Sequence, residues 1–156
     1  MNRSTVAAAF AFVLCLPVFG NAAEWTDAQQ GLWRFVEQSW VDDAGETGKW
    51  PGEYVHEKVR TWGAEWPVPR GRASMGKWNT FRDERTQLLQ YELFPHDVIV
   101  EGNTGVVFYS VVEVREGADG KSERSVQGLV ETAIREGRAW KYIGLTGFEM
   151  GGEDDD

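Results

Sequence analysis

The sequence has almost no cysteine. Cys15 is the only one among 156 residues, and it lies in an apolar N-terminal stretch. If that stretch is removed, the remaining chain can form no disulfide and offers no thiolate to a substrate or a metal. The folded protein must then be stabilised by its apolar core alone.

Catalytic and metal-binding motifs are also scarce. The chain has two histidines, His56 and His96, and neither belongs to a His-Glu-x-x-His pair that would bind zinc. No Gly-x-Ser-x-Gly segment is present. Residues 45–50 contain glycines and a lysine, but the segment is too short for a phosphate-binding loop and Trp50 replaces the required Ser or Thr. We therefore expect no metal centre and no cofactor.

Basic residues are in the minority, 16 against 25 acidic ones, which gives a formal net charge of −9. An anionic surface repels nucleic acid and anionic membranes, so we expect neither as a partner. Part of this charge is concentrated in the run Glu153–Asp156. We expect residues 151–156 to form a solvated, disordered tail.

Residues 1–23 have the layout of a secretory signal peptide. Arg3 supplies a positive charge, Val6–Val18 is an apolar run too short to cross a bilayer, and small residues lie at the end of the segment. We predict that the protein is exported to the periplasm or secreted, with cleavage near Ala22 or Ala23 and no membrane contact afterwards. An uncleaved N-terminal anchor is the alternative.

The spacing of apolar residues predicts helices in the first half of the mature chain and alternation predicts strands in the second half. Glycine-rich turns separate the strands. The helical part comprises a helix from the capping box Thr26–Gln29 to just before Gly45, a short helix from Pro51 to His56, a strand Lys58–Trp62 and a helix Ala73–Asp83. The strands are Leu88–Val100, broken near Pro95, then Val106–Arg115, Arg124–Arg135 and Ala139–Phe148. Helices followed by an antiparallel meander indicate an α+β fold, with one domain over residues 24–150.

Several segments in this order resemble the nuclear transport factor 2-like superfamily, in its bacterial SnoaL-like and ketosteroid-isomerase-like branch. They are His56 followed by Trp62-Gly63, then Pro67-x-Pro69-Arg70-Gly71, a helix with Trp78, the run Gly102–Val107 and the run Glu136–Ile143. The resemblance implies a cone-shaped, curved antiparallel sheet wrapped around N-terminal helices, also described as cystatin-like. Some relatives are isomerases, cyclases, dehydratases or hydrolases, many only bind a ligand or partner, and dimers are common.

The chain carries eight tryptophans and four tyrosines. The resemblance implies that some of these rings and one threonine surround the cone and bind the ligand. These residues are Tyr54, Trp62, Trp78, Tyr109, Tyr142 and Thr146. Strand alternation puts Trp140, Tyr142, Gly144 and Thr146 on one face, and the resemblance turns that face inward. Such a pocket would accept a small hydrophobic or aromatic ligand. The alternative is a cone packed solid with aromatic rings.

Three functions follow from these observations. The first is an exported small-molecule-binding protein without assured catalysis. The second is an acid–base isomerase, dehydratase or cyclase that uses His56 as its base, because histidine transfers protons near neutral pH. His96 is expected at an exposed strand kink. The third is a homodimer formed through the open face of the sheet, which would need a contiguous apolar patch there.

Overall fold

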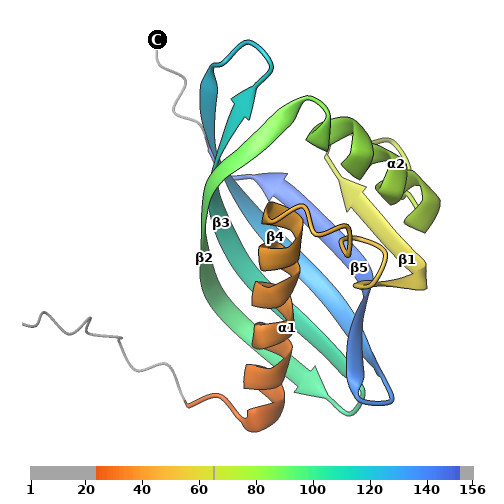
Figure 1. The fold of residues 1–156 in the computed structure, drawn as a ribbon. Coiled ribbons are helices and arrows are strands. Elements are labelled where there is room, and N and C mark those ends of the chain that lie inside the picture. The colour runs from red at the N-terminus through yellow and green to blue at the C-terminus, as the bar shows by residue number, and fades with distance from the viewer. Residues whose placement is uncertain (1–23, 65, 152–156) are drawn as a thin grey trace, which may run out of the picture.

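A computed structural model describes residues 24–64 and 66–151, and in that part of the chain two helices lie against the concave face of a curved, five-stranded sheet (Figure 1). The predicted signal peptide, its cleavage points and all but Gly151 of the predicted acidic tail lie outside the described residues. No helix in these two ranges is both long enough and apolar enough to cross a membrane.

Apart from one short helix, the elements follow the predicted order, with a helix, a strand and a second helix before the four strands of the meander. They are α1 (Asp27–Ala44), β1 (Val55–Gly63), α2 (Arg72–Asp83), β2 (Thr86–Glu101), β3 (Thr104–Gly117), β4 (Ser122–Glu136) and β5 (Ala139–Glu149). The strand order in the sheet is β1-β5-β4-β3-β2. Strands β2 to β5 form the predicted antiparallel meander, and β1 adds to the edge of β5 in parallel. The α+β class and the curved sheet around helices are thus confirmed.

Helix α1 begins at the predicted capping box. The Gln29 amide N–H donates to Thr26 Oγ1 at 3.3 Å, and the Thr26 N–H donates to Gln29 Oε1 at 2.9 Å, so two free donors at the helix start are satisfied. Leu32 and Val36 are fully buried against the sheet. Gly105 on β3 permits this close packing, because a β-carbon there would overlap Leu32 Cδ2.

The predicted short helix from Pro51 to His56 is wrong. Residues 50–54 form turns, and β1 begins at Val55. The Tyr142 N–H donates to the Tyr54 carbonyl at 2.9 Å. Residues from Val55 onward therefore pair with the edge of β5 and form a strand. Val55 is 2% exposed in that position. A β-branched residue gains more by packing in the sheet than by completing one helical turn.

Strand β2 does not break at Pro95 as predicted but continues through it. The pairing with β3 shifts between Pro95 and Asp97, which leaves His96 as an extra residue in a bulge. His96 is exposed and its Nε2 lies 3.0 Å from Ser110 Oγ. A bulge accommodates a proline that has no N–H for the ladder.

A second bulge corrects the predicted face of the last strand. Ala133 on β4 pairs with Tyr142, but Thr132 pairs with Gly144, so Ile143 is the extra residue. Beyond it the alternation is inverted. Leu145 therefore shares the concave face with Tyr142, whereas Gly144 and Thr146 do not share it as predicted.

Candidate functional site

Two adjoining hollows lie between α2, β1 and the wide end of the sheet. The outer hollow has a volume of about 450 Å³ and includes Trp66, Arg70 and Trp78 in its wall. The inner hollow, of about 260 Å³, includes Trp40 and Glu131. The two share wall residues, which are Trp50, Thr61, Met75, Arg82, Gln127 and Gly147. They therefore adjoin, and the aromatic rings do not fill the space inside the cone completely.

Glu131 supplies a buried carboxyl to the inner hollow. Its side chain projects from the concave face of β4, and the residue is only 6% exposed. Burial raises the pKa of this carboxyl to about 7, while contacts with the hydroxyls of Tyr142 and Tyr109 partly oppose the rise. Its Oε2 has no hydrogen-bond partner among the described residues. A carboxyl of this kind can both accept and release a proton near neutral pH.

Tyr109 is arranged to donate its proton toward this carboxyl. Trp40 Nε1 on α1 donates a hydrogen bond of 2.9 Å to the Tyr109 hydroxyl oxygen. A phenol has one proton and accepts through its oxygen, so the proton of Tyr109 is left free to point at Glu131. Burial, and then the charge of Glu131, raise the pKa of Tyr109 well above its usual value. Tyr109 therefore stays a neutral donor.

Tyr142 shares its proton between two acceptors. Ser39 Oγ lies 3.1 Å from the Tyr142 hydroxyl, and the Ser39 proton is already donated to the Val36 carbonyl at 2.7 Å. The Tyr142 proton can thus go to Ser39 or to the Glu131 carboxylate. Burial also raises the pKa of Tyr142 well above its usual value.

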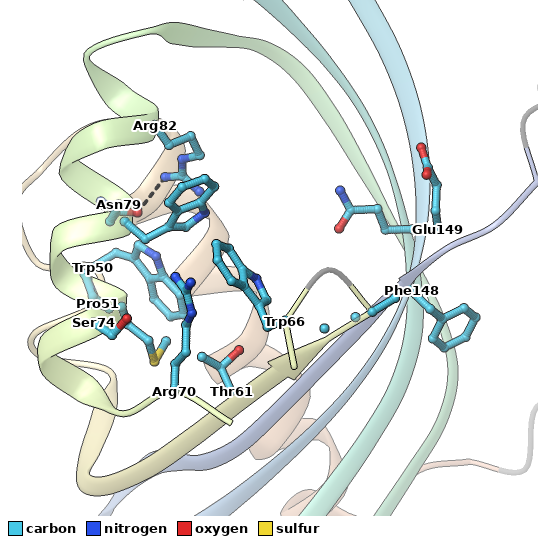
Figure 2. Close-up of a pocket in the computed structure, with 16 residues that line it drawn as sticks. Trp50, Pro51, Thr61, Trp66, Arg70, Ser74, Asn79, Arg82, Phe148 and Glu149 are labelled. Atoms are coloured by element: carbon cyan, nitrogen blue, oxygen red, sulfur yellow. Dashed lines mark hydrogen bonds between the residues drawn. The ribbon is translucent and has the colours of Figure 1, made fainter. Parts of the chain in front are cut away.

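The outer hollow combines indole rings with a cation. Trp66 and Trp78 meet edge to face, with ring centroids 5.3 Å apart. The Arg70 guanidinium lies over the Trp66 ring, and Figure 2 shows the two side chains directed toward each other. Within residues 24–64 and 66–151, no ion pair includes the Arg70 side chain, and none of its donors forms a hydrogen bond. The described residues therefore leave its donors unused.

The other arginine of the hollows, Arg82, has a structural role. Its Nη2 lies 2.6 Å from Asp43 Oδ1 on α1 and 2.9 Å from Asp83 Oδ1. It also donates to Asn79 Oδ1 at 2.7 Å, which Figure 2 marks. These contacts join α2 to α1 and neutralise the charge of Arg82. Arg82 therefore lines the hollows but has few donors left for a ligand.

His56, the predicted base, lines neither hollow. Its Nε2 lies 3.2 Å from Glu136 Oε1 at the far end of β4, and its Nδ1 accepts from the Lys58 N–H at 3.0 Å. These contacts tie the start of β1 to the β4–β5 turn. The arrangement does not bring His56 together with Tyr109.

The predicted ligand-binding residues are divided between wall and core. Trp78 lines the outer hollow and Thr146 borders the inner one. Tyr109 and Tyr142 lie in the core beside Glu131, 1% and 0% exposed. Trp62 is 54% exposed, and its Nε1 donates to the Trp66 carbonyl at 2.8 Å, outside both hollows.

The remaining predicted residue, Tyr54, is also buried outside the hollows. Its hydroxyl donates to Asp42 Oδ2 on α1. Asp42 further receives Lys49 Nζ at 3.2 Å and Thr47 Oγ1 at 3.0 Å. This cluster fixes the turn after α1, and so places Trp50 at the hollow.

Glu131 and Arg70 were missed by sequence reasoning, although each left a signal. Glu131 alternates in phase with Leu129 and Ala133, so a charge interrupts an apolar face. Arg70 belongs to a proline-rich loop whose course no pattern predicts, and its backbone pairs with Thr61 only in the folded sheet. No group of His, Cys, Asp and Glu that could hold a metal ion occurs among residues 24–64 and 66–151.

Comparisons with known proteins identify the fold. No family model and no curated protein matches the chain. A ketosteroid isomerase-like protein from Erwinia carotovora atroseptica matches with a TM-score of 0.72 at 7% identity, covering 82% of this chain and 100% of that one. An NTF2-like protein with a cystatin-like fold from Novosphingobium aromaticivorans matches at 0.60 and 14%, covering 80% and 83%.

A third solved structure, the CaMKII hub of S. rosetta, matches with a TM-score of 0.62 at 13% identity, covering 80% of this chain and 98% of that one. At such identities the likeness concerns the fold alone. The chain therefore has the nuclear transport factor 2-like, cystatin-like fold that the sequence resemblance indicated.

Proposed function

We propose that the protein binds a small, flat organic molecule in the joined hollows and transfers a proton to and from it through Glu131. The observation that carries this proposal is a buried carboxyl, with its pKa raised to about 7, in the wall of a space open to a ligand. Perturbed carboxyls of this kind, in a hollow, are typical of acid–base catalysts. Glu131 takes the role that the sequence had led us to expect of His56.

The reaction class that one such carboxyl serves is isomerisation by proton transfer. The substrate is a ketone with a carbon–carbon double bond between its β and γ carbons. The ionised Glu131 takes a proton from the α carbon, and the C–H electron pair forms a double bond to the carbonyl carbon as the carbonyl oxygen gains the other pair. The protonated Glu131 then returns the proton to the γ carbon, the oxygen pair restores the carbonyl, and the remaining double bond lies between the α and β carbons. Tyr109 would stabilise the carboxylate during the first step by donating its proton to it, since the Tyr109 oxygen already accepts from Trp40.

Deuterium exchange tests this function with 2-tetralone, a flat ketone with acidic protons beside its carbonyl. In D₂O the wild-type protein should exchange these protons faster than buffer does, as followed by proton NMR. Glu131→Gln should lower the protein-dependent rate by about 100-fold or more, the usual contribution of a positioned base. His56→Gln is the matched control and should keep the rate. Equal rates in wild type, Glu131→Gln and buffer would overturn the proposal.

We also propose a homodimer through the convex face of the sheet. Large apolar side chains are exposed there, with Phe94 at 43%, Ile99 at 49% and Phe148 at 49%. Phe94 and Phe148 lie in one cross-strand row, through Ser110 and Gly128. A patch of this kind is typical of an interface. Light scattering should give twice the mass of the chain, and Phe94→Lys with Phe148→Lys should halve it.

Export to the periplasm or the exterior completes the proposal and rests on the layout of residues 1–23. N-terminal sequencing of the protein from cells should begin near residue 23 or 24. An intact Met1 would contradict export by cleavage.

A further inference from the structure

We propose that the ligand carries a carboxylate and that Arg70 binds it, so that the substrate class is flat organic acids. This inference rests on the proposed binding in the joined hollows. It begins from a half-buried guanidinium that has no hydrogen-bond or ion-pair partner in the described ranges, in the wall of a hollow lined by indole rings and polar side chains. A bound anion would stabilise this cation, because a charge that is partly removed from water and left unpaired is costly.

The backbone holds Arg70 in place before a ligand arrives. Its N–H donates to the Thr61 carbonyl at 2.8 Å, and the Thr61 N–H donates to the Arg70 carbonyl at 2.9 Å. Thr61 belongs to β1, so this pair attaches the loop to the sheet. The Trp66 ring supports the guanidinium from one side. A guanidinium held in this way is ready for two parallel hydrogen bonds to a carboxylate.

The charges around the hollow favour a single negative charge on the ligand. Arg82 is already paired with Asp43 and Asp83, so Arg70 alone offers an unused positive charge among the described lining residues. Glu149, at the rim, adds a negative charge. A phosphate dianion would leave one charge unpaired in this space, and an organic cation would be repelled by Arg70. One carboxylate pairs with Arg70 and brings fewer negative charges near Glu149 than a dianion would.

The walls define the rest of the ligand. Trp50, Trp66 and Trp78 line the outer hollow, and Met75 belongs to the walls of both hollows. Indole faces and edges bind flat rings well. A molecule held by its carboxylate at Arg70 would lay its ring among these tryptophans and direct its far end toward Glu131.

Titration calorimetry with two probes of equal shape tests the inference, namely 2-naphthoate and its neutral amide, 2-naphthamide. The wild-type protein should bind 2-naphthoate about tenfold or more tightly than the amide, because charge-assisted hydrogen bonds are about twice as strong as neutral ones. Arg70→Gln should remove this preference, and Arg70→Lys should keep only part of it. Circular dichroism should show that both variants are folded.

Arg85→Gln is the matched control. Arg85 also lies over an aromatic ring, with its guanidinium carbon 4.2 Å from the Phe81 ring centroid, but it lines neither hollow. It should leave the preference unchanged. Equal binding of the two probes by wild type, or the same preference in Arg70→Gln, would overturn the inference, as would a failure to bind either probe.

Failure of the proposed catalysis has a different signature. A protein that prefers 2-naphthoate through Arg70 but exchanges no protons of 2-tetralone would keep the carboxylate site and lose the catalytic role of Glu131.

Discussion

Glu131 on β4 lies directly opposite Leu145 on β5, one ladder step beyond the bulge at Ile143. Without the extra residue, Gly144 or Thr146 would stand on the concave face beside the carboxyl. The bulge therefore places an apolar side chain next to Glu131 in the wall of the inner hollow. Apolar surroundings disfavour the ionised form, which agrees with the raised pKa.

The burial of Glu131 predicts a pH-dependent stability. Its pKa rises from 4.5 in the unfolded chain to about 7 in the folded protein, so the folded state holds the proton more tightly. The stability that Glu131 contributes is then fully present below pH 4.5, and it falls by up to about 3 kcal/mol as the pH rises to 7. Urea unfolding across this range should show the fall in wild type. Glu131→Gln should lack it, and an equal slope in the two proteins would contradict the buried carboxyl.

The hydrogen bond from Trp40 to Tyr109 predicts a shift in the titration of Glu131. Tyr109→Phe removes a donor to the carboxylate, so the pKa of Glu131 should rise by about one unit, or about 1.4 kcal/mol. Trp40→Phe should raise it by less, because the phenol stays but becomes a weaker donor. Carbon NMR of labelled glutamate carboxyls measures both. Phe35→Leu, which changes a ring beside Tyr142 without removing a donor, is the control.

The bond between Tyr54 and Asp42 predicts sensitivity to acid. This hydrogen bond is the main reason that the pKa of Asp42 is lowered from 3.8 to about 2, and burial partly opposes it. The stability that Asp42 contributes is present above pH 3.8 and is lost as the pH falls toward 2. Tyr54→Phe should therefore flatten the acid limb of a melting-temperature profile. An unchanged acid limb would show that Asp42 does not depend on the phenol.

The contact between Gly105 and Leu32 predicts a packing effect. Gly105→Ala should destabilise the fold by about 1–3 kcal/mol, because the new methyl group would overlap a leucine that is 0% exposed. The same substitution should cost less in a Leu32→Ala background, where the space is open. Chemical unfolding of the four proteins in this cycle measures the coupling. Additive costs would mean that the helix shifts to make room.

The regular elements could be predicted because their causes are local. The capping box at Thr26 satisfies its own helix, and alternation over residues 106–115 defines a strand with one buried face. The course of residues 51–56 could not be predicted, because a neighbouring strand far along the chain decides it. The face on which Thr146 lies could not be predicted either. It depends on the bulge at Ile143, and no residue type near Ile143 indicates a bulge.

The amino-acid sequence by itself determined the order of helices and strands, the meander, and the heavy load of aromatic rings, since periodicity and composition act over a few residues at a time. The tertiary structure alone decided which polar groups meet. Arg70 faces the indoles only through a loop attached to β1, and Glu131 acquires its raised pKa only when three strands and α1 exclude water from it. Desolvation is a property of the assembled fold, and no local pattern carries it.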